Sequence, residues 1–375
     1  MRVAVFLSFK NSLKTWVNSG TIERELKLFE ELAIKYNYQF TFFTYGKNEK
    51  DTLKNYSNNF ELFEMGNLIK LGPNNFINFL RSLILPLKLF KELNDIDVLY
   101  QNQLRGSWIV LILKKFSKKP LFIRTGYDLY KFSIHENKKK YKVIFFKILT
   151  KYSLKLSSIY TVTSETEKNF LISNFNFDEN KIYKIPNWTY KNTLNNSRRD
   201  LFKLLSVGRL VDQKNYKELF KKLKNLPEKF ELDIVGIGDE KEELEKLSKE
   251  YKLKVNFLGK LDNNSLQNIF EEYQFYLTAA KFEGNPKTVL EAMSKGCVVI
   301  ASDITNHSEI IRNKFNGYLF SLNEETLVDK IEELIKNENE IYFIQKNAID
   351  SVNENNELYI ILEKYHKLFA KLENI

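Results

Sequence analysis

The chain is poor in cysteine, histidine and proline. Its 375 residues include one cysteine, three histidines and six prolines. The single thiol, Cys297, excludes a disulfide framework and a cysteine zinc cluster, and it is typical of a reducing compartment. The histidines, His135, His307 and His366, are scattered and form no H-E-x-x-H motif. The sequence therefore predicts no metal and no other cofactor.

Long hydrophobic runs are also absent. No apolar run approaches the 18 residues that a membrane span needs, and Trp108–Leu113 is only six residues long. The segment Met1–Leu7 has one basic residue and no A-x-A cleavage site after it, which predicts a first buried strand rather than a signal peptide. We therefore expect a cytoplasmic protein that is soluble or peripheral at the inner face of the cell membrane.

The residues that are abundant point to a folded, basic protein. Hydrophobic residues make up 43% of the chain and aromatic residues 14%, which suffices for a full core and excludes global disorder. This length predicts two or three domains. The formal net charge is +10. No nucleic-acid-binding motif accompanies this charge, so we expect no nucleic-acid partner.

Part of the positive charge is concentrated between Lys131 and Leu156. Eight lysines stand there against one acid, Glu136, and three of them are consecutive: Lys138, Lys139 and Lys140. Apolar residues alternate with the lysines, in the pattern of a basic amphipathic helix that can lie on anionic lipid. The simpler interpretation, which we favour, is that this apolar stripe packs against a sheet.

Strands and helices alternate along the chain in two sets, which predicts an α/β fold with two doubly wound Rossmann-like domains. In the first set the predicted strands are Val3–Leu7, Gln39–Tyr45, Asp97–Tyr100, Leu121–Arg124 and Ile159–Val162, with helices near 23–36, 76–93, 107–116 and 141–156. In the second set the predicted strands are Phe202–Val207, Phe230–Val235, Val255–Leu258, Phe275–Thr278 and Val298–Ala301, with helices near 217–223, 240–251, 287–295 and 323–337.

The domain boundaries follow from this alternation. We predict an N-terminal domain over 1–190, a polar linker over 192–200 and a C-terminal domain over 201–355. The remaining segment, 356–375, is predicted to be a helix that packs back toward the first domain. Ligands of open α/β sheets lie at the carboxyl ends of the strands, so the expected site is a cleft between the two domains.

The densest chemical signal lies between Glu283 and Glu291. Gly284, Asn285 and Pro286 follow the first carboxylate, and Pro286 is predicted to be the first residue of a helix. The free N–H groups of Lys287, Thr288 and Val289 would then favour an anion such as phosphate. A carboxylate is a good acceptor for two adjacent sugar hydroxyls. The alternative is a surface loop for Glu283 and a solvated helix face for Glu291.

Two cations follow the first strand of the second domain. Arg209 and Lys214 lie five positions apart, after Gly208 and just before a helix. A planar guanidinium grips phosphate oxygens through two hydrogen bonds, and lysine adds a point charge. A solvated loop explains this pair equally well when it is considered alone. Together with Glu283 and Glu291 at another strand end, the pair becomes specific.

Other glycines carry less information. The run Gly236-Ile237-Gly238 lacks the third glycine of a dinucleotide fingerprint, since Lys241 occupies that position, and it predicts a tight strand-to-helix turn. Asn18-Ser19-Gly20-Thr21 is predicted to lie between the first strand and the first helix. Its small residues let the backbone approach a ligand, and Ser19 or Thr21 are candidate helix caps.

These motifs, taken together, resemble glycosyltransferase family 4. The order and spacing of that family are found in Ser206–Arg209 with Lys214, Val235–Gly238, Phe257–Gly259, Glu283–Pro286 with Leu290–Ala292, and Ser302-Asp303. The resemblance covers about 202–320 well. Over 1–190 it rests on the Asn18–Gly20 loop and on the strand–helix order. It implies a GT-B fold and a retaining transferase that uses a nucleotide-sugar donor.

The resemblance also implies roles for individual residues. Arg209 and Lys214 would hold the donor pyrophosphate, Glu291 the ribose hydroxyls, and Glu283 the transferred sugar. We predict that Glu283, Arg209 and Lys214 are also catalytic, because they lie where charge develops during transfer. The remaining donor-binding positions that it implies are Gly20, Gly259, Lys260, Gly284, Asn285, Pro286, Lys287 and Thr288. The donor diphosphate is neutralised by cations in this arrangement, so the resemblance implies no need for a metal.

The chain departs from the family pattern in two places. Many members have a histidine near the reacting sugar, whereas this chain has Arg124-Thr125-Gly126-Tyr127-Asp128, so Asp128 or Tyr127 is the candidate replacement and Asp128 the predicted catalytic residue. After Ser302-Asp303 the chain reads Thr305-Asn306-His307-Ser308-Glu309 instead of a glycine-rich turn. We interpret His307 there as a hydrogen-bonded surface residue.

The function expected from this resemblance is transfer of a hexose-type sugar, with UDP favoured as the nucleotide. The acceptor would be a glycan or a lipid-linked glycan of surface polysaccharide or lipopolysaccharide synthesis. Two alternatives stay open: a non-catalytic sugar-nucleotide-binding or scaffold protein on the same fold, and a phosphorylase.

Overall fold

The computed structural model describes residues 1–54, 56–195, 199–323 and 327–373. The predicted linker, helix 323–337 and C-terminal helix each include residues outside these ranges. The chain divides into two compact units. Unit 1 comprises Met1–Pro186 with Ile361–Ile375, and unit 2 comprises Asn187–Ile360. The boundary after Pro186 lies earlier than the predicted linker, so that Asn187–Tyr190 belong to unit 2 and not to the first domain.

Unit 1 is built on a seven-stranded parallel sheet with the strand order β3-β2-β1-β4-β5-β6-β7. Val5 of β1 lies opposite Phe42 of β2 and Tyr100 of β4. The inner strands are buried on both faces and read as nearly continuous apolar runs, as expected for a parallel sheet covered by helices. The strands are β1 Arg2–Phe6, β2 Gln39–Thr44, β3 Phe60–Glu64, β4 Val98–Asn102, β5 Leu121–Arg124, β6 Ile159–Val162 and β7 Ile182–Lys184.

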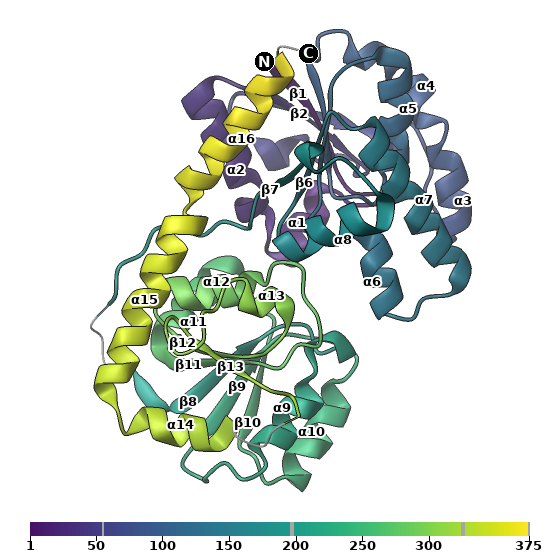
Figure 1. Cartoon of the computed structure of the whole chain (residues 1–375). Helices are drawn as coiled ribbons and strands as arrows, with labels where there is room; N and C mark the ends of the chain where they lie inside the picture. Colours follow the sequence, from purple (N-terminus) through teal and green to yellow (C-terminus); the bar gives the residue numbers. More distant parts are fainter. Residues whose placement is uncertain (55, 196–198, 324–326, 374–375) are drawn as a thin grey trace. The chain divides into compact units, whose positions relative to one another are not determined.

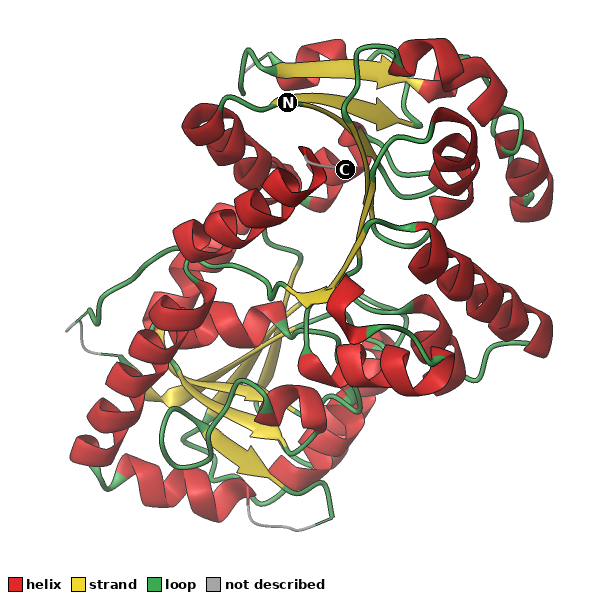
Figure 2. Cartoon of the chain, turned by 45° about the horizontal axis from the view of Figure 1, so that its top comes forward, coloured by secondary structure: helices red, strands yellow, loops and turns green. Residues whose placement is uncertain are grey.

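Helices cover both faces of this sheet (Figure 2). They are α1 Leu13–Ser19, α2 Ile22–Tyr36, α3 Asn75–Ser82, α4 Leu85–Leu89, α5 Ser107–Ser117, α6 Leu129–His135, α7 Lys140–Leu156 and α8 Glu165–Phe175, together with most of α16 Leu358–Glu373. The single helix predicted over 76–93 is wrong. The chain forms α3, α4 and a 3-10 turn at Phe90–Leu93 instead, and Pro86 stands at the start of α4, where a proline is tolerated.

The C-terminal helix α16 packs within unit 1, beside α2 (Figure 1). The ring of His366 stacks on that of Tyr36, with 3.7 Å between centroids, and His366 Nδ1 lies 2.7 Å from the hydroxyl of Tyr38. Phe369 contacts the rings of Tyr100 and Phe122 over the sheet. The last helix therefore closes one face of the unit 1 sheet.

Unit 2 is built on a six-stranded parallel sheet with the strand order β10-β9-β8-β11-β12-β13. Its strands are β8 Asp200–Val207, β9 Glu231–Val235, β10 Val255–Gly259, β11 Tyr273–Thr278, β12 Val298–Ser302 and β13 Tyr318–Phe320. The order of connection reverses between β8 and β11. This topological switch point is where open α/β sheets leave room for a ligand.

The two faces of the unit 2 sheet bury alternate residues of its strands. Leu204 and Phe275 belong to one apolar cluster, and their neighbours Leu205 and Tyr276 belong to the other. The helices of unit 2 are α9 Tyr216–Leu223, α10 Lys241–Glu250, α11 Asn263–Glu272, α12 Lys287–Ser294, α13 Thr305–Ser308, α14 Leu327–Ile335 and α15 Glu338–Asn356. The first cluster includes residues of α9 and α14, and the second residues of α11, α12 and α15.

Candidate active site

The predicted site residues of unit 2 gather at the switch point of its sheet. One loop, Gly208–Asn215, follows β8, and a second, Ala279–Pro286, follows β11. Hydrogen bonds join the two loops: the amide of Lys281 donates to the carbonyl of Gln213 at 2.9 Å, and Gln213 Nε2 donates to the carbonyl of Phe282 at 3.0 Å. The loops therefore form one connected edge above the ends of β8 and β11.

Lys214 and Glu283 form an ion pair across these loops. Lys214 Nζ lies 2.6 Å from Glu283 Oε1, and the side chains are only 16% and 11% exposed. Gly208 leaves the space that the lysine stem occupies, since a Cβ at this glycine would lie 3.0 Å from Lys214 Cε. The lysine that the sequence assigns to a pyrophosphate and the glutamate that it assigns to a sugar are thus direct neighbours.

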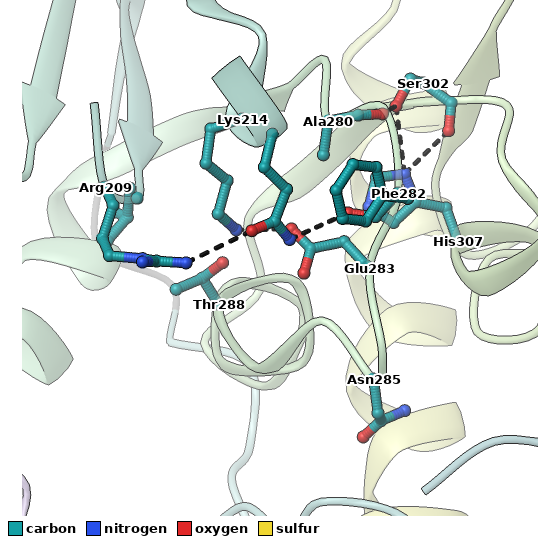
Figure 3. A network of polar contacts seen from close by, with 12 residues as sticks. Arg209, Lys214, Ala280, Phe282, Glu283, Asn285, Thr288, Ser302 and His307 are labelled. Atoms are coloured by element: carbon teal, nitrogen blue, oxygen red, sulfur yellow. Dashed lines mark hydrogen bonds and ion pairs between the residues drawn. The ribbon is translucent and has the colours of Figure 1, made fainter. Parts of the chain in front are cut away.

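Arg209 lies on the open side of the same edge. Its side chain is exposed, and Nη2 donates to Gln213 Oε1 at 3.3 Å. Figure 3 shows Arg209, Lys214 and Glu283 converging on Thr288 at the start of α12. Gln213, which the sequence analysis did not single out, connects the arginine to the loop after β11 and positions it.

The amino end of α12 faces this group. Lys287 is the first helical residue, and Pro286 is the residue before it, with ψ at 98°. The prediction that Pro286 is the first helical residue is therefore wrong by one position, because its extended backbone places it outside the helix. Apolar residues of α12, including Val289 and Met293, are buried against the sheet and hold this end in place. The first-turn amides, together with the helix dipole, favour an anion here.

Two neighbours hold the backbone that leads into α12. Asn306 Nδ2 donates to the carbonyl of Gly284 at 2.6 Å. Asn285 Oδ1 accepts from the amide of Asn187 at 2.9 Å, and its side chain points away from Lys214 and Glu283 (Figure 3). The Asn285 side chain thus anchors the segment before α12 to Asn187 at the start of unit 2, and only the backbone of Asn285 borders the site.

Glu291 lies in the second turn of α12 and is buried, with 4% of its surface exposed. The alternative of a solvated helix face for Glu291 is therefore excluded.

Two residues of the first turn of α12 make contacts of their own. Lys287 places its ammonium 5.5 Å from the ring centre of Trp188. Thr288 Oγ1 accepts from the hydroxyl of Tyr276 at 2.8 Å, which fixes the rotamer of Thr288 beside Arg209.

His307 is fully buried, so the interpretation as a surface residue is wrong. Its Nδ1 lies 2.8 Å from the carbonyl oxygen of Ser302, at the end of β12. A carbonyl only accepts, so Nδ1 carries the proton in this contact and Nε2 is left as an acceptor. Burial lowers the pKa of His307 and keeps the ring neutral. Figure 3 shows the His307 ring behind the ring of Phe282.

The glycines just after β9 and at the end of β10 support the loop that carries Arg209. A Cβ at Gly236 would lie 1.9 Å from the carbonyl oxygen of Gly208, and one at Gly238 would lie 2.2 Å from that of Leu210. These glycines make a close backbone contact and do not form a dinucleotide fingerprint. Gly259 ends β10 with φ at +71°, and its carbonyl accepts from the amide of Gly236 at 2.7 Å. Lys260, the next residue, is exposed.

Asp128, the predicted catalytic residue of unit 1, has a structural role. It caps α6: Oδ1 accepts from the amide of Lys131 at 2.9 Å and Oδ2 from the hydroxyl of Thr150 at 2.8 Å. The side chain is fully buried, and burial raises the pKa of its carboxyl group. Because both oxygens hold the fold together, the catalytic assignment of Asp128 is corrected. Tyr127 is 42% exposed and packs on the ring of Phe132.

The predicted loop around Gly20 also differs. A helix that the sequence analysis missed, α1, ends at Ser19, and Gly20 caps it with φ at +69°. Thr21 precedes α2 but makes no side-chain cap hydrogen bond. Asn18 and Ser19 are therefore helical, and only Gly20 keeps the loop character that the donor-binding prediction required.

In the described part of the chain, no three His, Cys, Asp or Glu side chains are grouped so as to hold a metal ion.

The C-terminal part of the chain matches a known family. The model of the family "Glycosyl transferases group 1" matches residues 192–351. These residues form a group 1 glycosyltransferase domain. They include Arg209, Lys214, Glu283, Glu291 and the whole of α12, so the switch-point site lies inside the matched domain. The predicted resemblance to glycosyltransferases is confirmed at this level.

Curated proteins and solved structures agree with the group 1 match. An uncharacterized glycosyltransferase of Methanocaldococcus jannaschii is 28% identical over 290 residues, 73% of this chain and 74% of the relative. The UDP-Gal:alpha-D-GlcNAc-diphosphoundecaprenol alpha-1,3-galactosyltransferase of Escherichia coli is 25% identical over 66% of this chain and 68% of the relative.

Among solved structures, sucrose-phosphate synthase from Thermosynechococcus elongatus superposes with a TM-score of 0.83 over the full length of both chains, at 17% identity. This superposition confirms the predicted GT-B fold.

Proposed function

We propose that this glycosyltransferase moves a hexose-type sugar from a nucleotide diphosphate, with UDP favoured, to a glycan or lipid-linked acceptor in surface polysaccharide or lipopolysaccharide synthesis. The Escherichia coli relative is named for a UDP-sugar donor and a diphosphoundecaprenol acceptor. The observation that carries the proposal is the convergence of Arg209, Lys214 and the amino end of α12 at the switch point of the unit 2 sheet.

The charge arrangement suits a diphosphate leaving group. Breaking the bond between the sugar C1 and the diphosphate oxygen adds negative charge to the diphosphate while the sugar becomes oxocarbenium-like. Arg209, Lys214 and the first-turn amides of α12 would stabilise that growing charge. Donors of this kind are typically worth about 3–4 kcal/mol each in the transition state. Glu283, held by Lys214, would lie on the sugar side and stabilise the cationic ring.

The Lys214–Glu283 ion pair explains how the site is kept ready for a donor. In the absence of a donor, each charged group satisfies the other, so that neither is buried alone. A diphosphate would share the ammonium group, while Glu283 would remain beside the transferred sugar. Glu291 would accept hydroxyl groups of the ribose. We further propose a retaining route, in which the acceptor hydroxyl attacks from the leaving-group side and a donor phosphate oxygen takes its proton.

The test is a donor screen combined with two substitutions. Thermal shift and transfer assays with UDP, GDP, ADP and CMP sugars identify the donor. With that donor, Arg209→Ala and Lys214→Ala should each lower kcat about 100- to 1,000-fold, as expected for removal of one electrostatic donor. Lys203→Ala is the matched control, since this exposed lysine lies on β8 and outside the switch-point loops.

The contradicting outcomes are distinct. Wild-type kinetics in the Arg209 and Lys214 variants would show that the diphosphate binds elsewhere. Nucleotide binding without transfer to any sugar or lipid acceptor would favour the non-catalytic alternative. Transfer to inorganic phosphate would favour the phosphorylase. Activity that is lost in excess EDTA and restored by a divalent cation would contradict a metal-independent diphosphate site.

A further inference from the structure

The helices on one side of unit 1 expose an apolar surface that the core does not use. Phe76 and Leu80 of α3, Ile84 between the helices, and Leu87 of α4 recur every three or four residues, and Leu87 is 78% exposed. Monomeric soluble proteins seldom expose contiguous apolar surface of this kind without a partner.

A second apolar stripe lies on α7, beside α3 (Figure 1). Ile144 and Ile148 are 57% and 51% exposed, and Tyr141 and Tyr152 extend the stripe by one turn at each end. The interpretation that this stripe packs against a sheet is therefore wrong. The side of α7 that packs on the unit is instead formed by Leu149, Thr150, Ser153 and Leu154.

Aromatic contacts make the two stripes one surface. Phe79 of α3 contacts the ring of Phe145 of α7, with 5.6 Å between centroids. Trp108 of α5 lies beneath both rings, at 5.1 Å and 6.1 Å from them, and its Nε1 donates to Ser82 Oγ. We call the exposed surface of α3, α4 and α7 the docking face.

The charge of the chain is concentrated on the segments that form this face. Residues 65–91 and 137–164 contain eleven lysines and arginines and no aspartate or glutamate. The whole chain has a net charge of +10, so all of its other residues together carry −1. Lys139, Lys140, Lys142, Lys147, Lys151 and Lys155 are exposed along and just before α7, and Lys138 pairs with Glu136 at 2.7 Å.

We propose that the docking face binds an anionic lipid bilayer, with Leu80, Ile84, Leu87 and Ile148 entering the interface and the lysines lying among the headgroups. Exposed apolar residues flanked by lysines fit the boundary between acyl chains and anionic headgroups. A second copy of this chain fits poorly, because it would bring two strongly cationic surfaces together. The proposal does not depend on the identity of the sugar donor.

Co-sedimentation of the full chain with phosphatidylcholine vesicles, with and without phosphatidylglycerol, tests the electrostatic part. Binding should require phosphatidylglycerol and weaken with salt. Lys138→Glu, Lys139→Glu and Lys140→Glu together should lower the affinity about 100-fold, since each lysine near an anionic surface contributes about a factor of five. Lys246→Glu, Lys249→Glu and Lys254→Glu, three exposed positions of unit 2, form the charge-matched control.

A tryptophan reporter tests insertion of the apolar residues. In the L87W variant, emission should shift to the blue on vesicle binding and be quenched by brominated lipid. In the Y342W variant, where Tyr342 is 56% exposed on α15 of unit 2, emission should change no more than in the wild-type chain, whose Trp108 lies beneath the docking face and sets the background for both variants. Equal quenching in both variants, or none in L87W, would contradict insertion of the docking face.

Three further outcomes would overturn the proposal. The wild-type chain could fail to bind anionic vesicles at low salt. The control triple variant could lose as much binding as the triple variant at 138–140. Sedimentation velocity without vesicles could show a dimer that the charge reversal at 138–140 dissociates, in which case the face joins two copies of the chain.

Discussion

The two sheets share a strand order, but their switch points differ in chemistry. In unit 1 hydrogen bonds between uncharged groups join the loops at the point between β1 and β4: Ser8 Oγ donates to the carbonyl of Asn102, and the amide of Phe9 donates to the carbonyl of Arg105. A Cβ at Gly106 would lie 2.9 Å from the Phe9 nitrogen, so these loops touch backbone to backbone.

In unit 2 the corresponding point carries the Lys214–Glu283 ion pair, Arg209 and the amino end of α12. The topology therefore determines where loops meet, and the residues on those loops determine whether the meeting point can hold a charged ligand. Substitutions in one unit at a time can break or sharpen this difference.

The largest effect is expected from Gly236→Ala. Its backbone has φ at +155°, and a Cβ would lie 1.9 Å from the carbonyl oxygen of Gly208, so the loop that carries Arg209 must move. We expect a loss of about 4 kcal/mol or more in the free energy of unfolding, together with loss of nucleotide binding. Circular dichroism melts and nucleotide titrations measure both. Gly259→Ala is the control: φ is +71° with no atom within 4 Å, so the cost should be about 1–2 kcal/mol.

Glu283→Gln should lower kcat about 100-fold, because this carboxylate would face the sugar that becomes cationic. It also removes the charge partner of Lys214. Steady-state kinetics with the donor from the screen measure the effect, and Glu272→Gln, an exposed position near the end of α11, should change neither kcat nor KM. A raised KM with unchanged kcat would show that Glu283 contacts a part of the donor that does not react.

Glu291→Gln should mainly raise the donor KM, by about tenfold, since ribose contacts are nearly equal in the ground state and the transition state. The residue is buried, so the variant is first checked for an unchanged melting temperature. A fall in kcat at constant KM would mean that the roles of Glu283 and Glu291 are exchanged.

Glu167 of unit 1 and His307 of unit 2, both buried, should change the stability of the chain with pH in opposite directions. Burial raises the pKa of Glu167, which accepts from the amide of Asp128, from 4.5 to about 8. The folded state therefore holds the proton of Glu167 more tightly than the unfolded state does. The resulting stabilisation of the fold is present below pH 4.5 and is lost as the pH rises toward 8. Glu167→Gln should reduce the fall in Tm over this window by a few degrees, and Glu165→Gln, exposed on the same helix, should not.

The pKa of His307 is lowered from 6.5 by burial, so its contribution is present above pH 6.5 and is lost as the pH falls below that value. His307→Gln should make the Tm less sensitive to acid below pH 6.5. Scanning calorimetry across this range measures both slopes. An unchanged acid slope in His307→Gln would show that another group controls the acid side.

Much of the fold could be predicted because parallel strands leave long apolar runs in the sequence. Leu121–Arg124 and Ile159–Val162 match the predicted bounds, and most other strands differ by one or two residues. The strands that were missed, β3, β7 and β13, all lie at sheet edges, where one side needs no apolar partner. Helix α1 was missed because its seven residues are too few to show a clear period.

The candidate site residues could be named from the sequence, but the contacts between them could not. Lys214 and Glu283 are 69 positions apart, and only the pairing of β8 with β11 brings them together. Asp128 was assigned to catalysis because it lies in the stretch where many members of the resembled family have a histidine. Its position directly before the apolar start of α6 was the available capping signal. The sequence did not indicate that His307 is buried, because the segment around it is polar.

Hydrogen exchange with and without UDP tests the central claim, that the switch point of unit 2 binds the donor diphosphate. We expect slower exchange at the amides of Lys287, Thr288 and Val289 and in the loop Gly208–Asn215, because those N–H groups would donate to phosphate oxygens. No such protection is expected at 208–215 and 287–289 in a variant that carries Arg209→Ala and Lys214→Ala. If saturating UDP leaves hydrogen exchange at 208–215 and 287–289 of the wild-type chain unchanged, the assignment of this site is contradicted.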